Sequence, residues 1–422
     1  MAIDMTKDWV AYSYDASQHE QFLSGLEDVQ KDTTVEPVKT NEVLFMPLSK
    51  VPEGELAEEA RMDSEAPKVT ELPFEGRLPI AVHLDDGRYY CIRPYLWKNI
   101  KQHHKDNAAI LSDMVHREHW EEACAHLNMS KPYLTKSVLM MVRGGKISGW
   151  FSEFNFNKSQ LMQVQFVEEC LGERFPDMVF DSGDISHLFT TANYQLGGSM
   201  SETYHRLGMD DSVVAAYAEA WVKAGGSVEE LETAVPYARF LTGESGLTSI
   251  TLAPYLKLRD GRTFYLGGSL SVNHRGEDKM VWGKFEEFPD KIAVLYQRGF
   301  SGLKELCDRV ILYPASCLTH VLNKFRATVP VKGMKDCIED FEMFYNPDNP
   351  ELTCRAIDVY NAVNELLDEL GSKNGPMRQV QNTELIARLL VDNWDDYDKK
   401  TPAKLFGKRE DTSPKEIDWL SI

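Results

Sequence analysis

The sequence predicts an α+β protein in which an antiparallel sheet packs with helices and the C-terminal part is mainly helical. Asp-Gly turns between alternating apolar residues indicate two central β-hairpins, near residues 78–96 and 247–288. Apolar residues at helical spacing indicate helices after residue 300, most clearly from Leu352 to Leu370. The chain has 422 residues, of which 43% are hydrophobic, and this is enough for a sizeable core.

Residues 1–75 are expected to form an acidic, largely extended arm. They contain 17 acidic and 6 basic residues and so contribute −11 of the formal charge of −20. Their two short apolar patches are separated by Asp, Glu, Thr and Pro, which disfavours an independent core. The arm could be a solvated tether or could shield a basic groove, and on either view its deletion should leave a folded protein.

Residues 76–300 are expected to form the α+β core. Pro79–Leu84 and Arg88–Ile92 flank the turn Asp85-Asp86-Gly87 as the two strands of the first hairpin. The pattern from Trp97 to Asn128 has helical spacing instead.

Residues 121–149 resemble the helix-turn-helix of small excisionase-type DNA-binding proteins. An alanine-bearing helix is followed by a turn at Asn128–Ser130 and by Pro132, which suits the first turn of a second helix. The resemblance implies that the second helix presents Lys131 and Lys136 to DNA. An ordinary helical hairpin is the alternative.

Residues 88–158 have a local charge of +5, with 11 basic and 6 acidic residues. Arg143 and Lys146 belong to this segment, and aromatic residues are interleaved with its charges. Cations beside aromatic rings suit single-stranded nucleic acid, since the cations neutralise phosphates and the rings stack on bases. The alternative is that these aromatic residues are core.

The stretch 247–288 is expected to form three strands, at 247–258, 263–273 and 279–288. In the second strand Phe264 and Leu266 face the core, while Tyr265 faces the other, available side. This side and its turns carry a basic group that we predict to bind nucleic acid, with Tyr265 as a stacking residue: Lys257, Arg259, Arg262, His274, Arg275 and Lys279.

Residues 301–398 are expected to form a helical C-terminal region, and residues 399–422 a loosely attached tail. Helices are predicted at 301–312, 315–325, 350–370 and 382–394, because apolar residues recur there at helical spacing.

Several classes of function lack their signals. The seven cysteines include no CxxC pair, which suits a reducing cytoplasm, and no window is apolar enough to span a membrane. The sequence contains no Walker A motif, no GxGxxG after a strand, no EF-hand loop and no HExxH. We therefore assign no catalytic residue, metal site or cofactor.

Three segments together resemble a family of uncharacterised phage- and plasmid-encoded proteins, grouped as a domain of unknown function, over about residues 140–395. They are Arg143–Ile147, the sheet from Leu247 that ends in the turn Asn273–Gly276, and Ile357–Val363. Where the family has Cys-x-Asn after the sheet, this chain has Cys317-Leu318-Thr319. The resemblance implies a mobile-element origin, and thus the cytoplasm of a bacterial host, but no established activity.

Two function classes remain open. One is a mobile-element accessory protein that binds nucleic acid, with single-stranded DNA favoured, on a basic, aromatic-bearing sheet. The other is a virion structural protein or host-defence-interaction protein that acts through protein contacts, either with a host protein or in a homo-oligomer.

Overall fold

The computed structural model describes residues 3–5, 11–56, 79–93, 96–97, 100, 110–111, 113–114, 117, 119–129, 137–152, 158–186, 189–243, 249–266, 268–274, 277–326, 328–346, 349, 352–374 and 385–407. The predicted α+β class is confirmed, because two sheets, built almost wholly from antiparallel pairs, pack with helices.

The larger sheet has seven strands, all paired antiparallel. Their order is β1 (Tyr12–Asp15), β8 (Val179–Ile185), β9 (Phe189–Gln195), β10 (Val235–Gly243), β11 (Ile250–Lys257) and β12 (Thr263–Tyr265), and β13 (Leu270–Val272) also pairs with β11. Phe240 and Leu252 are opposite one another on its apolar face, and Tyr237 and Tyr255 are opposite one another on the other face. Alternation along each strand therefore gives the sheet one apolar and one polar-aromatic side.

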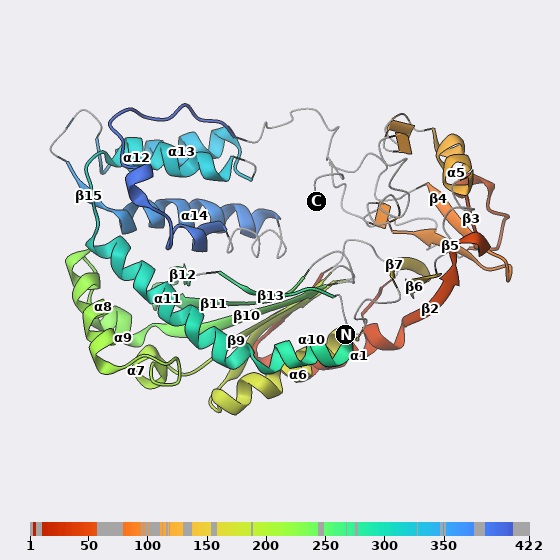
Figure 1. Ribbon diagram of the computed structural model, residues 1–422, viewed down its shortest axis with the longest axis horizontal. Helices are drawn as coiled ribbons and strands as arrows, with labels where there is room; N and C mark the ends of the chain where they lie inside the picture. The colour runs from red at the N-terminus through yellow and green to blue at the C-terminus, as the bar shows by residue number, and fades with distance from the viewer. Residues whose placement is uncertain are drawn as a thin grey trace.

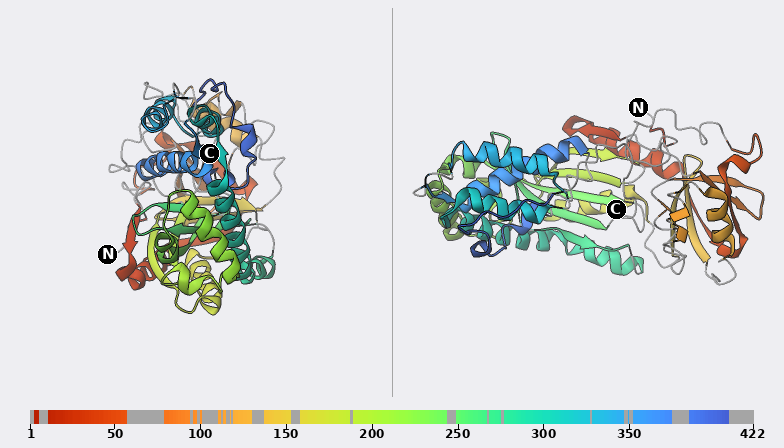
Figure 2. Two further views of the ribbon diagram at one scale, coloured as in Figure 1. Left: turned by 90° about the vertical axis from the view of Figure 1, so that its left-hand side faces the viewer. Right: turned by 90° about the horizontal axis from the view of Figure 1, so that it is seen from above.

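The smaller sheet has six strands and forms the right-hand end of the molecule in Figure 1. Their order is β2 (Thr33–Lys39), β6 (Ser137–Arg143), β7 (Lys146–Ser152), β5 (Tyr89–Ile92), β4 (Ile80–Leu84) and β3 (Val43–Pro47). The pairing of β5 with β7 is parallel, whereas the other pairings are antiparallel. Figure 2 shows from above that the two sheets lie toward opposite ends of the molecule.

Helices cover both sheets. They are α1 (His19–Lys31), α5 (Trp120–Met129), α6 (Gln160–Arg174), α7 (Met200–Thr203), α8 (Asp211–Lys223), α9 (Val228–Thr233), α10 (Asp278–Glu286), α11 (Phe288–Asp308), α12 (Pro314–Leu322), α13 (Val331–Glu342) and α14 (Ala356–Asn374). Figure 1 shows α1, α6 and α10 along one side of the larger sheet and α12, α13 and α14 on the other. A two-stranded pairing of β14 (Val310–Ile311) with β15 (Cys354–Arg355) ties the end of α11 to the start of α14.

The N-terminal segment differs from the expected extended arm. Residues 11–56 contribute β1 to the larger sheet, then α1, and then β2 and β3 to the smaller sheet. Phe22 and Leu26 on α1 are fully buried against the larger sheet's core. The acids of this segment lie on exposed or half-buried positions outside that apolar stripe, so a high average charge coexists with a folded element.

The predicted third strand at 279–288 is wrong, because α10 occupies this stretch. Val281, Phe285 and Phe288 recur at helical spacing and are all buried. Asp278 lies in the first turn, where its negative charge stabilises the helix by interacting with the positive end of the helix dipole. The helical spacing of these buried residues therefore predicts the structure of this stretch correctly, whereas its position after two strands does not.

The predicted second helix of the 121–149 hairpin is wrong from Ser137 onward. The first helix is present as α5, but β6 and β7 form a β-hairpin after it. Its turn is Gly144-Gly145, with φ values of 58° and 70° that an L side chain rarely adopts. Lys131 and Lys136 lie outside the described residues.

The helical C-terminal region is confirmed by α12, α13 and α14. The last of these starts at Ala356 rather than at Pro350, since the residues before it form β15. The tail is attached over 399–407: the Ala403 amide donates to Thr319 Oγ1 at 2.8 Å and the Phe406 amide donates to Asn323 Oδ1 at 2.9 Å. Within the described residues, no helix is both long and apolar enough to cross a membrane.

Candidate anion-binding site at the junction of the two sheets

A cavity of about 300 Å³, here called the junction pocket, lies where the smaller sheet meets the larger one. Its lining comes from α1, β2, β6, the start of α6 and the end of β10. The lining residues are Leu26, Val29, Gln30, Thr33, Val35, Met141, Arg143, Lys158, Ser159, Gln160, Met162, Gln163, Gly243 and His274. Ligand sites commonly occupy such junctions between packed units.

The junction pocket is cationic although the chain is acidic. Arg143 and His274 are 4% and 5% exposed, so both basic side chains are held inside the protein. Lys158 is one-third exposed and pairs with Asp278 at 2.6 Å. Among the described residues that line the cavity there is no aspartate or glutamate. An anion inside it would therefore meet Arg143 and Lys158, and the Asp278 carboxylate that pairs with Lys158 lies outside the lining.

The positive end of α6 opens onto the same cavity. Ser159 is the N-cap, and its Oγ accepts a hydrogen bond from the Met162 amide at 3.2 Å. Helix N-termini attract anions because their first amide groups and the helix dipole both point outward. The helix runs for 15 residues. Its field adds to that of Lys158, the residue directly before the cap.

Two glutamines fix the floor of the junction pocket. Gln163 donates through Nε2 to the Lys158 carbonyl at 2.8 Å, and its Oε1 accepts from Thr242 at 2.6 Å. Gln160 accepts from Thr190 at 2.8 Å. These bonds join the start of α6 to β9 and β10, so the helix terminus is held rigidly against the larger sheet.

Arg143 is positioned by the strand and turn that carry it. It ends β6, and its Nε donates to Thr33 Oγ1 on β2 at 2.8 Å. Its carbonyl accepts from the fully buried Arg93 at 3.0 Å, while the Gly144 amide donates to Asp32 at 2.7 Å. The guanidinium is thus fixed by the smaller sheet, whereas Lys158 and His274 come from segments beside the larger one.

Of the other predicted basic residues, those that the structure describes lie outside the lining of the junction pocket. Lys146 lies opposite Arg143 in the hairpin register but is 3% exposed and does not line the cavity. Lys279 is on an exposed position of α10. Arg275 is outside the described residues, as are Lys131 and Lys136.

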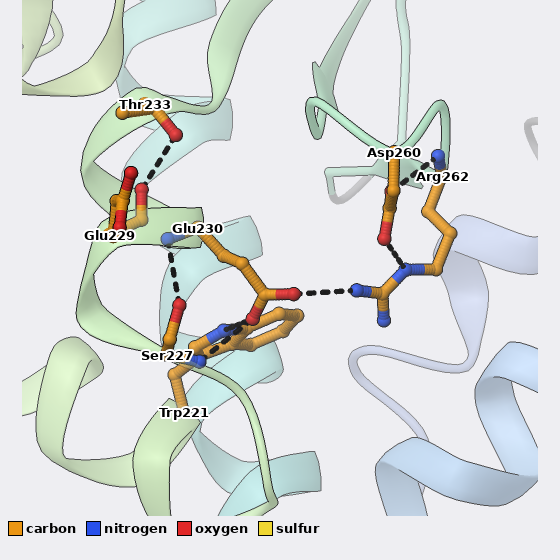
Figure 3. A network of polar contacts seen from close by, with 7 residues as sticks. All are labelled: Trp221, Ser227, Glu229, Glu230, Thr233, Asp260 and Arg262. Carbon is orange, nitrogen blue, oxygen red and sulfur yellow. Dashed lines mark hydrogen bonds and ion pairs between the residues drawn. The ribbon is translucent and has the colours of Figure 1, made fainter.

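The predicted basic edge around Asp260-Gly261 is neutralised by carboxylates (Figure 3). Arg262 contacts Asp260 at 2.6 Å and Glu230 at 3.1 Å. Glu230 also accepts from the Ser227 amide and from Trp221 Nε1, and these contacts lower its pKa. Arg259 lies 3.6 Å from Glu229. Glu229 and Glu230 come from α9, a short helix preceding β10, whereas Asp260 belongs to the turn itself.

The expected availability of Tyr265 is wrong. Phe264 and Tyr265 do point to opposite faces, but both are buried, at 1% and 5% exposure. The Tyr265 hydroxyl donates to Asp368 of α14 at 3.0 Å. Lys257 is exposed and lies with Nζ 5.9 Å from the centre of the Tyr237 ring. A helix that follows a hundred residues later covers this strand, which a local pattern could not indicate.

The aromatic residues of the 88–158 segment that the structure describes are mainly core. Trp97, Trp150 and Phe151 are each at most 3% exposed. The bases of a nucleic acid could not stack on them without unfolding the smaller sheet.

Lys158, Ser159, Gln160 and Gln163 are site residues that the sequence reading missed. Their available signal is a lysine directly before a serine N-cap, which places a charge at a helix N-terminus. Across the described residues, no group of three His, Cys, Asp or Glu could hold a metal ion. No family model, curated protein or solved structure matches this chain.

Proposed function

We propose that the protein binds a phosphate-bearing ligand in the junction pocket, and that this ligand is single-stranded nucleic acid. The observation that carries the proposal is the cavity in which Arg143, Lys158 and His274 meet the N-terminus of α6. Phosphate oxygens accept charge-assisted hydrogen bonds from such groups. The basic edge at Arg259 and Arg262 is a weaker candidate, because carboxylates already contact both guanidinium groups.

A single strand suits the junction pocket better than a duplex. A cavity of about 300 Å³ admits one phosphate with its sugar, whereas a duplex presents its phosphates on a stiff, wide cylinder. The chain's charge of −20 also repels long polyanions outside the cationic cavity. Binding should therefore be local and should decrease as the salt concentration rises.

The ion pair between Lys158 and Asp278 allows a test in two directions. Lys158→Gln should weaken binding of a labelled single-stranded oligonucleotide roughly tenfold and reduce its salt slope by about 0.7. Asp278→Asn should strengthen binding about threefold, because Lys158 is then released from its carboxylate. Fluorescence anisotropy over a salt series measures both effects. The ion pair of Lys223 with Glu219 on α8, 2.9 Å long, supplies matched controls as Lys223→Gln and Glu219→Gln.

The choice of ligand separates a strand from a free nucleotide. Single-stranded DNA should bind more tightly than a mononucleotide, and both should respond to Lys158→Gln. A mononucleotide that binds as tightly as the strand would replace nucleic acid by a nucleotide in the proposal. Equal losses in the Lys158 and Lys223 variants would overturn the junction pocket as the binding site.

A further inference from the structure

A second groove, here called the α13–α14 groove, has the opposite character to the junction pocket. It encloses about 560 Å³ and lies between two helices of the C-terminal region. Its lining includes Asp336 and Asp340 from α13, and Glu365 and Glu369 from α14. The junction pocket is lined by other elements, so the two sites are independent of each other.

The rim of the α13–α14 groove is negatively charged. Asp336, Asp340 and Glu365 are all exposed, and within the described part of the chain none of the three forms an ion pair. Lys332 is the single basic residue in the described lining. A binding partner with positive charges would therefore gain attraction on both sides of the groove.

The floor of the groove is apolar. Phe341 is 6% exposed, and Leu366 and Leu370 are half-buried beside it. Phe344, at the end of α13, is 76% exposed. An aromatic ring left in water next to an apolar floor is the kind of anchor that a protein partner covers.

The spacing of the lining fits a helix. The α14 residues that line the groove include Asp358, Ala362, Leu366 and Leu370, which are every fourth residue along one face of the helix. These 12 steps correspond to about 18 Å, which is the length of a helix of about 12 residues. Acidic rims along an apolar floor match a partner helix that has an apolar stripe flanked by Lys or Arg.

We propose that the α13–α14 groove binds a basic amphipathic helix of a partner protein. The charge of the two rims, the apolar floor and the length of the α14 lining select this occupant. A second copy of the chain is a poorer match, because each copy carries a charge of −20. The chain's own residues 408–422 carry four acidic and three basic side chains and are a poorer match for the same reason.

The test uses the full-length protein and a labelled 14-residue peptide of Leu and Lys arranged at helical spacing. A second peptide of the same composition, with its leucines spread around the helix, controls for simple charge attraction. We expect the amphipathic peptide to bind at least tenfold more tightly than the second peptide. Phe344→Ala, and separately the pair Asp340→Lys and Glu365→Lys, should each weaken its binding at least tenfold.

Matched controls show whether the groove itself is responsible. The pair Glu219→Lys and Glu229→Lys makes the same change of charge at exposed positions of α8 and α9, and should reduce affinity less than threefold. Equal binding of the two peptides, or equal losses in the two charge-reversed proteins, would overturn the proposal. So would displacement of the peptide by a synthetic 408–422 segment, or a groove-dependent dimer in sedimentation.

Discussion

The carboxyl group of Asp368, on α14, is half-buried where α14 packs against Tyr265 of the larger sheet. Burial raises its pKa above the ordinary value of 3.8, and the bond from Tyr265 only partly opposes this. A raised pKa in the folded state favours the protonated form. Its contribution to stability is therefore full below the ordinary pKa and is lost as the pH rises through the folded value.

Asp368→Asn should remove this pH dependence. From about pH 3.5 to about pH 7, the free energy of unfolding of the natural protein should fall relative to that of the variant. Tyr265→Phe should enlarge the pH dependence of stability. The hydrogen bond from Tyr265 favours the ionised carboxylate, so its removal should raise the pKa of Asp368 further. Urea unfolding at several pH values measures both differences. A constant difference between the natural protein and Asp368→Asn would contradict the assignment.

Substitution of Arg259 and Arg262 tests whether the basic edge has a structural role. Replacing both with Ala should lower the free energy of unfolding by about 0.5 to 1 kcal/mol, since their ion pairs are partly exposed. The same change should leave the affinity for single-stranded DNA within about twofold, because the junction pocket is untouched. A large loss of affinity in a stably folded variant would return the binding surface to this edge.

At the scale of elements, the sequence predicted best where a short pattern decides the structure. The turn at Asp260-Gly261 needs the positive φ of 93° that Gly261 adopts, and the strand before it, β11, lies within the predicted 247–258. The prediction for the stretch after α5 was wrong because Pro132 and neighbouring helix formers indicated a helix. Val138 to Val142 followed by two glycines is the β-hairpin signal that should have prevailed.

The junction pocket could be predicted only in part, because its residues are far apart along the chain. Arg143 and His274 were both expected to contact phosphate, but no sequence pattern indicated that they line one cavity. Their meeting depends on α1 and α6, which join the two sheets. Burial of Tyr265 under α14 has the same kind of cause. Long-range packing is what a local reading of residues omits.

Two glycines on neighbouring helices make a prediction about α10 and α11. A Cβ at Gly299 would lie 2.5 Å from Leu266 Cβ and 2.8 Å from its Cα, so Gly299→Ala should cost about 1–3 kcal/mol by pushing α11 off the sheet. A Cβ at Gly283 on α10 would meet nothing within 4 Å. Gly283→Ala should therefore stabilise the protein by about 0.5–1 kcal/mol through helix propensity.

Thermal unfolding of the two glycine variants distinguishes a helix from a strand at 278–286. A destabilising Gly283→Ala would contradict a helical position with open space for a Cβ at this residue. A neutral Gly299→Ala would contradict the close approach of α11 to Leu266.

At the scale of the whole molecule, all seven cysteines are buried and none is in a disulfide bond. Burial raises the pKa of Cys170 to about 11 and that of Cys124 to about 12, so both remain protonated at neutral pH. We expect a thiol reagent to label none of the seven in the native protein within minutes, and all seven in denaturant. Rapid labelling of one cysteine without denaturant would reveal local opening around that residue.

The first strand of the chain sets a limit on the order of events during synthesis. Ser13 of β1 pairs with Asp184 of β8, and Thr33 of β2 pairs with Arg143 of β6. A ribosome adding about 5–20 residues per second takes roughly 10 to 30 s to pass from β1 to β8. During that interval β1 has no strand to join, while β2 and β3 find their partners earlier. The smaller sheet can therefore form in the nascent chain before the larger sheet does. During this time β1, an edge strand of the larger sheet, is already outside the exit tunnel.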